Sequence, residues 1–308
     1  MMKKLIKFVP HKGTRTRLQK WAGEGPPVVA VLRLNGVIGA VSNFRSGLSI
    51  TDLAEPIEEA FKMKNAKAVA LVINSPGGSP VQSSLIFKRI RALAVEKELP
   101  VYAFVEDVAA SGGYMLACAA DEVYADESSI VGSIGVISSG FGFTGLIEKV
   151  GIERRVHTSG ENKSSLDPFV KENPEDVQRL LDLQSEVHES FKQLVRTSRG
   201  DRLNEDEGQT KLFTGEFWAA AKGVELGQID GIGDIRATMR DKFGDKVDMR
   251  VVGSKQSWMR KMMGMSSATP SHGATSMIEG LPSDIAGNLA QGLVETLETK
   301  TLWSRFGL

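Results

Sequence analysis

Three short apolar runs rich in β-branched residues alternate with two amphipathic segments, and this alternation restricts the fold more than any other feature. The runs are VVAVLRL (28–34), KAVALVIN (67–74) and PVYAFVE (100–106). Their continuous apolar character is typical of strands that are covered on both faces. The segments between them place apolar residues at helical spacing, so the order is β-α-β-α-β. The sequence therefore predicts an α/β fold with a largely parallel sheet.

The chain divides by composition into three parts. We expect a basic N-terminal tail over 1–27 and a globular domain over 28–252. Residues 253–308 predict a linker rich in Ser, Gly, Met and Thr, followed by an amphipathic helix. That helix carries apolar residues at a strict spacing of four, namely Leu281, Ile285, Leu289, Leu293 and Leu297. Such a narrow stripe has to pack against its own domain or a neighbouring subunit, with a membrane surface as the alternative.

Within the domain, several later elements also have sequence signals. Asn173 and Pro174 predict the start of a long helix that runs towards Arg199. We further expect a short helix over 144–150, a strand over 154–158 and a helix over 215–227.

The charge balance limits the classes of partner. The chain has 38 basic and 38 acidic residues, and a protein whose main function is to bind nucleic acid needs an excess of basic residues. Residues 1–20 are the local exception, because they contain only basic charges interleaved with apolar residues. We interpret them as a solvated tail. The alternative is a basic surface helix that contacts anionic lipid at the membrane periphery.

Two observations argue against an exported or membrane-spanning chain. The basic start reaches Pro10 and His11 after only a few apolar residues, so a secretory signal peptide is not expected. The most apolar run, over 28–41, is interrupted by Arg33 and Asn35 and is too short to cross a bilayer. We therefore expect a cytoplasmic protein.

Two glycine turns carry the strongest indication of chemistry. The motif NSPGG (74–78) lies between a buried strand and a helix that Ser79 caps, and SGG (111–113) lies between the next strand and helix. Because parallel strands end at the same edge of a sheet, both turns should emerge together. They can then supply two backbone N–H donors to an oxyanion, one from Gly77 or Gly78 and one from Gly112. Stabilisation of this kind is what acyl transfer requires.

Ser111 is the nucleophile that these donors would serve. Taken alone, a serine at a helix start is more often an N-cap than a nucleophile, and the pair of turns shifts that balance. A serine hydroxyl also needs a base, and the histidines of the chain are His11, His157, His188 and His272. Two of these lie in the terminal segments, and His188 should lie on the solvated face of its helix. His157 and a lysine kept neutral by burial, such as Lys163, both remain open as bases.

Two other patterns carry less weight. GFGFTG (140–145) matches the spacing of a dinucleotide-binding loop, but it does not open the first βαβ unit. Cys118 lies two helical turns after Ser111 and should be a small buried residue. As the single cysteine, it can form neither an intrachain disulfide nor a thiolate metal cage. We expect no cofactor and no metal ion.

Four motifs in order resemble the signal peptide peptidase A (SppA) family of serine peptidases. They are NSPGGS, AASGGYMLACAADEVYADESSIVGSIGVI, GENKSSLDPF and LFTGEFWAAAKGVELGQIDGIGD, and the resemblance covers roughly 28–245. It implies a ClpP/crotonase-like fold, a repeated ββα spiral with peripheral helices. It also implies a Ser/Lys dyad in which Ser111 is the nucleophile, Lys163 is the general base and the hydroxyl of Ser133 orients the lysine.

The resemblance further implies the partners. Substrates would be extended, largely apolar peptides such as signal-peptide remnants, and the chain would assemble into a ring or dome of identical subunits with the sites facing inward. Members of the family usually carry an N-terminal membrane anchor or signal, whereas this chain shows only its short basic segment.

Three other functions compete with this one. A ClpP-type peptidase shares both glycine turns but needs a histidine about one strand-helix unit after the serine, where 127–140 has none. An acyl-CoA enzyme of the crotonase group uses the same backbone donors with a carboxylate in place of the Ser/Lys pair. The third alternative is a catalytically degenerate scaffold.

Overall fold

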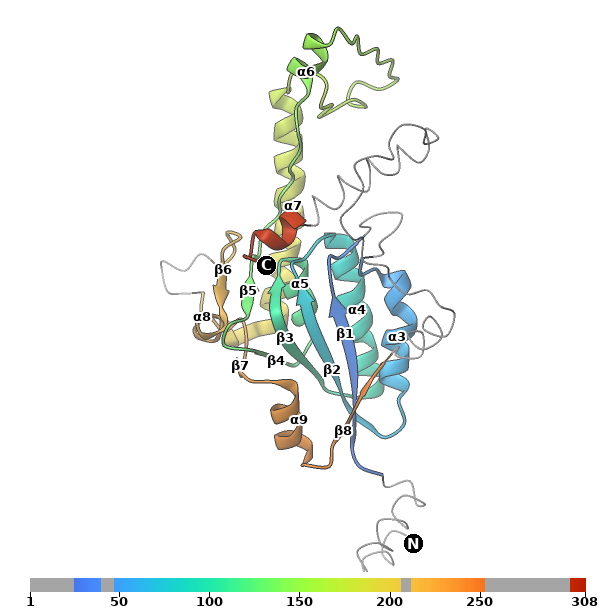
Figure 1. Cartoon of the computed structure of the whole chain (residues 1–308), viewed down its shortest axis with the longest axis vertical. Helices are drawn as coiled ribbons and strands as arrows, with labels where there is room; N and C mark the ends of the chain where they lie inside the picture. Colours follow the sequence, from blue (N-terminus) through green and yellow to red (C-terminus); the bar gives the residue numbers. More distant parts are fainter. Residues whose placement is uncertain (1–24, 40–46, 206–211, 253–299) are drawn as a thin grey trace, which may run out of the picture.

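The computed structural model describes residues 25–39, 47–205, 212–252 and 300–308, and all structural statements refer to these residues. Its centre is a sheet formed by β1 (Val28–Asn35), β2 (Ala66–Ser75) and β3 (Val101–Ala110). Two helices, α3 (Ile50–Lys62) and α4 (Pro80–Lys97), connect these strands, which run parallel to one another (Figure 1). The predicted α/β class with a largely parallel sheet and peripheral helices is confirmed.

The sheet grows on both sides of this centre. Its order is β6-β5-β3-β2-β1-β8, and β4 joins β3 to β7 off this path. The outer strands are short: β4 (Glu122–Ala125), β5 (Ile130–Gly132), β6 (Phe217–Ala219), β7 (Gly231–Ile232) and β8 (Asp248–Val251). The first half of β3 pairs with β4 and its last three residues pair with β5. The end of β3 therefore separates from β4 and continues into the turn that holds Ser111.

Helices cover both faces of the sheet. On one face α3 and α4 contribute Ile57, Ile86 and Ile90 to the main core, and all three are fully buried. On the other face Met239 of α9 (Ile235–Phe243) packs with Val29 and Phe104 of the sheet. Each such side chain contributes about 1.5–3 kcal/mol by burial, so the sheet is a rigid support for the turns at its edge.

The helix caps follow the sequence signals. Ser79 Oγ accepts a hydrogen bond from the N–H of Gln82, and Asn173 Oδ1 accepts one from the N–H of Glu175. The two helices start at Pro80 and Pro174, as predicted. Capping therefore fixes where α4 begins, directly after the NSPGG turn.

Two predicted elements are wrong. The structure has no strand over 154–158, and 215–227 contains the strand β6 followed by the helix α8 (Ala220–Glu225). Trp218 of β6 pairs with Val131 of β5. This pairing outweighs the local helical preference of the alanines that follow, because helix propensity is weaker than tertiary contact.

A long arm projects from the domain. It consists of the chain after β5, the short helix α6 (Thr144–Lys149) and the first half of α7 (Pro174–Arg199), and Figure 1 shows it rising away from the sheet. A helix of this length measures about 39 Å, and its buried residues, Phe191, Val195 and Arg199, all lie near its C-terminal end. Helix α6 buries none of its residues. The arm therefore lacks a core shared with the rest of the domain.

An ion pair joins the base of α7 to the sheet. The guanidinium of Arg199 donates two hydrogen bonds to the carboxylate of Asp230, at 2.8 and 3.0 Å, and its Nε donates a third to the carbonyl of Gly227. The Arg199 side chain is only 1% exposed. Burial acts to raise the pKa of Asp230, but hydrogen bonds from Arg199 and from the backbone N–H of Val123 outweigh it and hold this pKa below its ordinary value. The ionised pair is thus part of the folded state.

We expect Asp230→Asn to lower the free energy of unfolding by about 3 kcal/mol, because it leaves the buried charge of Arg199 unpaired. Urea denaturation at a fixed protein concentration measures this change. In the wild-type protein, the contribution of the ionised Asp230 to the free energy of unfolding should be complete at neutral pH. It should decline as the pH falls below about 4, because the pKa of this carboxyl is lower in the folded state than in the unfolded chain. Asp245→Asn removes an exposed carboxylate and should change the free energy of unfolding little. An equal loss of stability in both variants would show that the Arg199–Asp230 pair is not the cause.

The termini lie mostly outside the described residues. This applies to residues 1–24 of the predicted basic tail, to the linker and to the leucine stripe of the predicted C-terminal helix. The division at 27 and 252 therefore stays a prediction. Among the described helices, none combines the length and apolar character needed to cross a bilayer.

Candidate active site

Ser111 occupies a strained turn at the edge of the sheet. It follows the last residue of β3 and precedes α5 (Gly112–Ala117), with φ 52° and ψ −122°. A serine rarely adopts this conformation, which costs about 1–3 kcal/mol and persists only where the surrounding structure imposes it. Here the N–H of Ser111 donates to the carbonyl of Gly132 at 2.8 Å, which holds the turn. Strained strand-to-helix turns of this kind present nucleophilic serines in other hydrolases.

The hydroxyl of Ser111 does not cap α5. Its side chain makes no capping hydrogen bond, whereas Ser79 and Asn173 do so at their helices. The N-cap interpretation of Ser111 is therefore wrong.

The glycines of the two turns are required by direct contact. A Cβ on Gly77 would lie 2.8 Å from the Cβ of Ser111 and 2.9 Å from the backbone nitrogen of Gly112. A Cβ on Gly113 would lie 2.4 Å from the carbonyl oxygen of Ser75. Real Cβ atoms do not approach other atoms so closely, so any larger residue would push the turns apart. The structure thus brings both turns together at one edge of the sheet.

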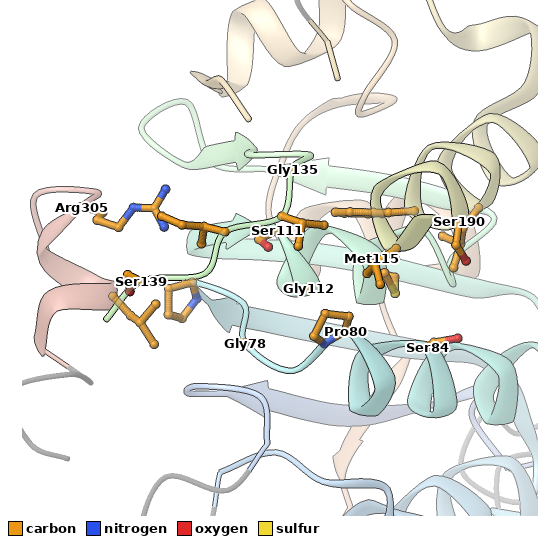
Figure 2. Close-up of a pocket in the computed structure, with 17 residues that line it drawn as sticks. Gly78, Pro80, Ser84, Ser111, Gly112, Met115, Gly135, Ser139, Ser190 and Arg305 are labelled. Carbon is orange, nitrogen blue, oxygen red and sulfur yellow. The ribbon is translucent and has the colours of Figure 1, made fainter. Parts of the chain in front are cut away.

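The glycines of the two turns differ in whether their backbone N–H groups already have an acceptor. The N–H of Gly77 donates to Ser75 Oγ at 3.2 Å. By contrast, the N–H groups of Gly78 and Gly112 have no acceptor among the described residues. Gly78, Ser111 and Gly112 all line one pocket (Figure 2). Of Gly77 and Gly78, Gly78 is therefore the one whose N–H is available to donate to an oxyanion.

This pocket forms a groove of 310 Å³. One wall is apolar and is made by Met115 of α5 together with Val187, Phe191 and Leu194 of α7. The opposite side follows the chain after β5, from Gly135 to Ser139. An apolar wall beside a nucleophile and two free donors can accept a peptide with an apolar side chain next to the bond to be cleaved.

Ser133 lies close to the nucleophile through the backbone. It is 5% exposed, its φ is 54°, and its N–H donates to the carbonyl of Glu216 at 2.7 Å. The preceding residue, Gly132, accepts the hydrogen bond from Ser111. The structure therefore fixes the backbone at Ser133, while the role of its hydroxyl stays a prediction.

Lys163 lies elsewhere. It is exposed and belongs to the segment between α6 and α7 at the far end of the arm, and it does not line the groove at Ser111 (Figure 1). Its segment is nevertheless held in shape, because Ser165 Oγ donates to Asp176 at 3.0 Å and Arg154 pairs with Asp167 at 2.7 Å. Within one chain, the structure does not bring Lys163 and Ser111 together.

The structure corrects the assignment of one histidine. His188 is half-buried rather than solvated, and its Nε2 lies 3.2 Å from the carbonyl oxygen of Ile134. The spacing of His188 with Phe191, Val195 and Arg199 is the signal that could have placed it on the packed face of α7. His157 is exposed and belongs to the arm.

Cys118 is confirmed as a buried small residue. Burial raises the pKa of its thiol to about 12, so it stays protonated and is a poor nucleophile.

The groove also contains residues that the sequence did not indicate. Leu302 and Arg305, from the last residues of the chain, line it together with Ser111. No local motif predicts this, because the contact joins the end of the chain to a turn in its first half.

Comparisons with known proteins identify the family of the chain. The model of Peptidase family S49 matches residues 94–246. The probable protease SohB of Buchnera aphidicola subsp. Schlechtendalia chinensis is 31% identical over 234 residues, which cover 74% of this chain and 72% of that protein. A Brucella abortus (strain 2308) protein named Na(+)/H(+) antiporter NhaA is 47% identical over 283 residues, which cover 91% of this chain and 37% of that protein. The chain thus spans little more than a third of the length of this relative.

A solved structure gives a weaker likeness. A mutant of the 1510-N membrane-bound stomatin-specific protease is 15% identical, with a TM-score of 0.46, over 74% of this chain and 99% of that one.

A strained serine beside two backbone N–H groups without acceptors, in an α/β fold, is an arrangement that hydrolases acting through a serine use. The family model and the SohB relative specify the class further: the chain belongs to peptidase family S49. The predicted resemblance to SppA-type peptidases is thereby confirmed.

Proposed function

We propose that the chain is a serine endopeptidase that cleaves extended, largely apolar peptides, such as signal-peptide remnants, with Ser111 as nucleophile and Lys163 as general base. One observation carries this proposal: the strained Ser111 shares a groove with the free N–H groups of Gly78 and Gly112. A site built for helix capping alone would need neither the strain nor the second glycine turn.

The proposed reaction has two stages. The hydroxyl of Ser111 attacks the scissile carbonyl and gives its proton to the neutral amine of Lys163, while Gly78 and Gly112 donate to the oxyanion. The lysine then passes the proton to the leaving amine, and the C–N bond breaks to give an ester of Ser111. Water attacks this ester with help from the same lysine, which releases the acid product and the free serine.

If Lys163 is the base, it has to come from a second copy of the chain. Within one chain the segment between α6 and α7, which contains Lys163, lies at the end of the arm, and Lys163 does not line the groove at Ser111. In a ring, each arm can extend over the neighbouring subunit, because ring interfaces join two different surfaces head to tail. We infer that Lys163 of one copy completes the site of the next, and we propose that the hydroxyl of Ser133 orients the lysine there.

The surface of the arm supports such an assembly. More than half of the exposed large apolar side chains of the described chain lie between residues 137 and 183, including Ile137 at 67% and Phe141 at 78% exposure. An apolar surface of this extent marks a contact with another protein. We therefore propose a homo-oligomer, and static light scattering should give a multiple of the mass of one chain. A fully active monomer would refute the shared site.

Labelling with a fluorophosphonate tests the nucleophile directly. The probe should modify Ser111 of the assembled protein, and a peptide map should find the adduct on that residue. Lys163→Ala should slow the labelling strongly while Lys171→Ala, an exposed lysine in the same arm, should not. A folded oligomer that resists the probe would instead favour the catalytically degenerate scaffold.

A further inference from the structure

The last residues of the chain form one end of the groove. Phe306 is 8% exposed and packs on Val108 and Ala110 of β3. Its ring also meets that of Phe217 at a centroid distance of 5.0 Å and an angle of 69°. This anchor holds the C-terminal segment beside the nucleophile, where Leu302 and Arg305 line the pocket.

Arg305 is the one charged residue that lines this groove in the described part of the chain. It has no carboxylate partner among the described residues, although ion pairs hold other arginines such as Arg154 and Arg199. In Figure 2 its side chain extends from the C-terminal segment towards the groove, on the opposite side of Ser111 from Met115 and Ser190. The two ends of the groove therefore differ: Met115 lies at one, Arg305 together with Leu302 lies at the other, and Ser111 lies between them.

We propose that Arg305 binds a carboxylate of the substrate, and that the groove selects peptides carrying such a group beyond the scissile bond. This inference rests on the proposed peptidase function and names a substrate class for the same site. A guanidinium presents two parallel N–H donors to a carboxylate, which fixes both position and orientation. The free C-terminus of a peptide already released from a larger protein supplies that carboxylate. The amide of an unbroken chain does not.

The chemistry of the two ends sets the direction of the peptide. The apolar end, with Met115 and Phe191, accepts side chains before the scissile bond, and the carboxylate lies at Arg305 after it. In the reverse direction Arg305 would face the positive N-terminus of the peptide, which is unfavourable. Peptide remnants with nearby C-termini should thus be cleaved in preference to internal segments of long chains.

Matched peptides test the proposal. An N-acetylated, leucine- and alanine-rich peptide is made as the free acid and as the C-terminal amide, with one to four residues after the cleavage site. We expect kcat/KM to be roughly fivefold higher for the best acid than for its amide, the effect of an exposed ion pair of about 1 kcal/mol. The ratio should fall with added salt.

Variants identify the residue responsible. Arg305→Ala should reduce the acid-to-amide ratio to about one, Arg305→Lys should leave a part of it, and Phe306→Ala should reduce it by releasing the anchor. The control is Arg240→Ala, an exposed arginine of α9 on the other face of the sheet, which should change neither the ratio nor the activity. A wild-type ratio of one, or an equal loss in Arg240→Ala, would overturn the proposal.

A third peptide separates the two sources of a carboxylate. It ends in an amidated glutamate, and its cleavage shows whether Arg305 also accepts a side-chain carboxylate. A preference for the acid alone, or for both peptides over the plain amide, supports carboxylate recognition. Equal cleavage of all three contradicts it.

Binding measurements keep the inference separate from the proposed function. Fluorescence anisotropy with N-terminally labelled peptides and the Ser111→Ala oligomer requires no hydrolysis. Tighter binding of the acid, lost in Ser111→Ala/Arg305→Ala, supports the role of Arg305 even if the wild-type protein cleaves nothing. Hydrolysis with no preference for the acid over the amide, in either binding or cleavage, contradicts the inference about Arg305 but agrees with the proposed peptidase function.

Discussion

Ser111→Ala is expected to lower kcat/KM for an apolar peptide by about 10⁴-fold or more, because it removes the hydroxyl that we propose forms the ester intermediate. The free energy of unfolding should stay within about 0.5 kcal/mol of the wild-type value. The hydroxyl caps nothing, and alanine keeps both the Cβ and the backbone strain. Peptide hydrolysis followed by chromatography, together with urea denaturation, measures the two effects.

Two further variants make this result specific. Ser84→Ala removes a hydroxyl from the same groove and should keep most of the activity. Ser111→Gly should be as inactive as Ser111→Ala but no less stable, because glycine tolerates the positive φ that strains the serine. Hydrolysis that persists in Ser111→Ala would exclude this residue as the nucleophile.

Mixing two inactive variants should restore hydrolysis. Ser111→Ala lacks the nucleophile and Lys163→Ala lacks the base, so each oligomer alone should be inactive. When the two chains are co-expressed in equal amounts, a site shared between neighbours combines an intact serine with an intact lysine in roughly a quarter of cases. About a quarter of the wild-type rate should therefore return, whereas a dyad within one chain would give none.

The identity of the base has its own controls. Lys163→Arg should not substitute in the mixture, because a guanidinium keeps its proton and cannot accept one from Ser111. His157→Ala should leave the wild-type rate unchanged. Since a lysine must be uncharged to act as a base, kcat/KM should rise with pH to an alkaline plateau. Loss of activity in His157→Ala, with full activity in Lys163→Ala, would assign the base to the histidine.

Local signals predicted the parts of the molecule that depend on neighbouring residues. The apolar runs around 28–34, 67–74 and 100–106 became β1, β2 and β3, and the start of α4 followed from its cap. The contact between the two glycine turns also followed from strand order alone. That contact was predictable because parallel strands place their carboxyl ends at the same edge of a sheet.

Features that depend on distant contacts could not be predicted in this way. Nothing near Lys163 in the sequence indicates that its segment projects on an arm, because that depends on where α7 leaves the domain. The backbone strain at Ser111 is also invisible in a sequence, since its neighbours impose it. The C-terminal wall of the groove arises from the packing of Phe306 on β3, which involves residues far apart in the chain.

The projecting arm has a consequence for the time before assembly. If the site is shared between neighbours as proposed, a newly made single chain contains the nucleophile but not the base that would activate it, and it is inactive until it assembles. Because association follows mass action, activity per chain should rise with protein concentration and disappear on dilution. The protein would then be harmless to its surroundings until enough copies have gathered to enclose the sites.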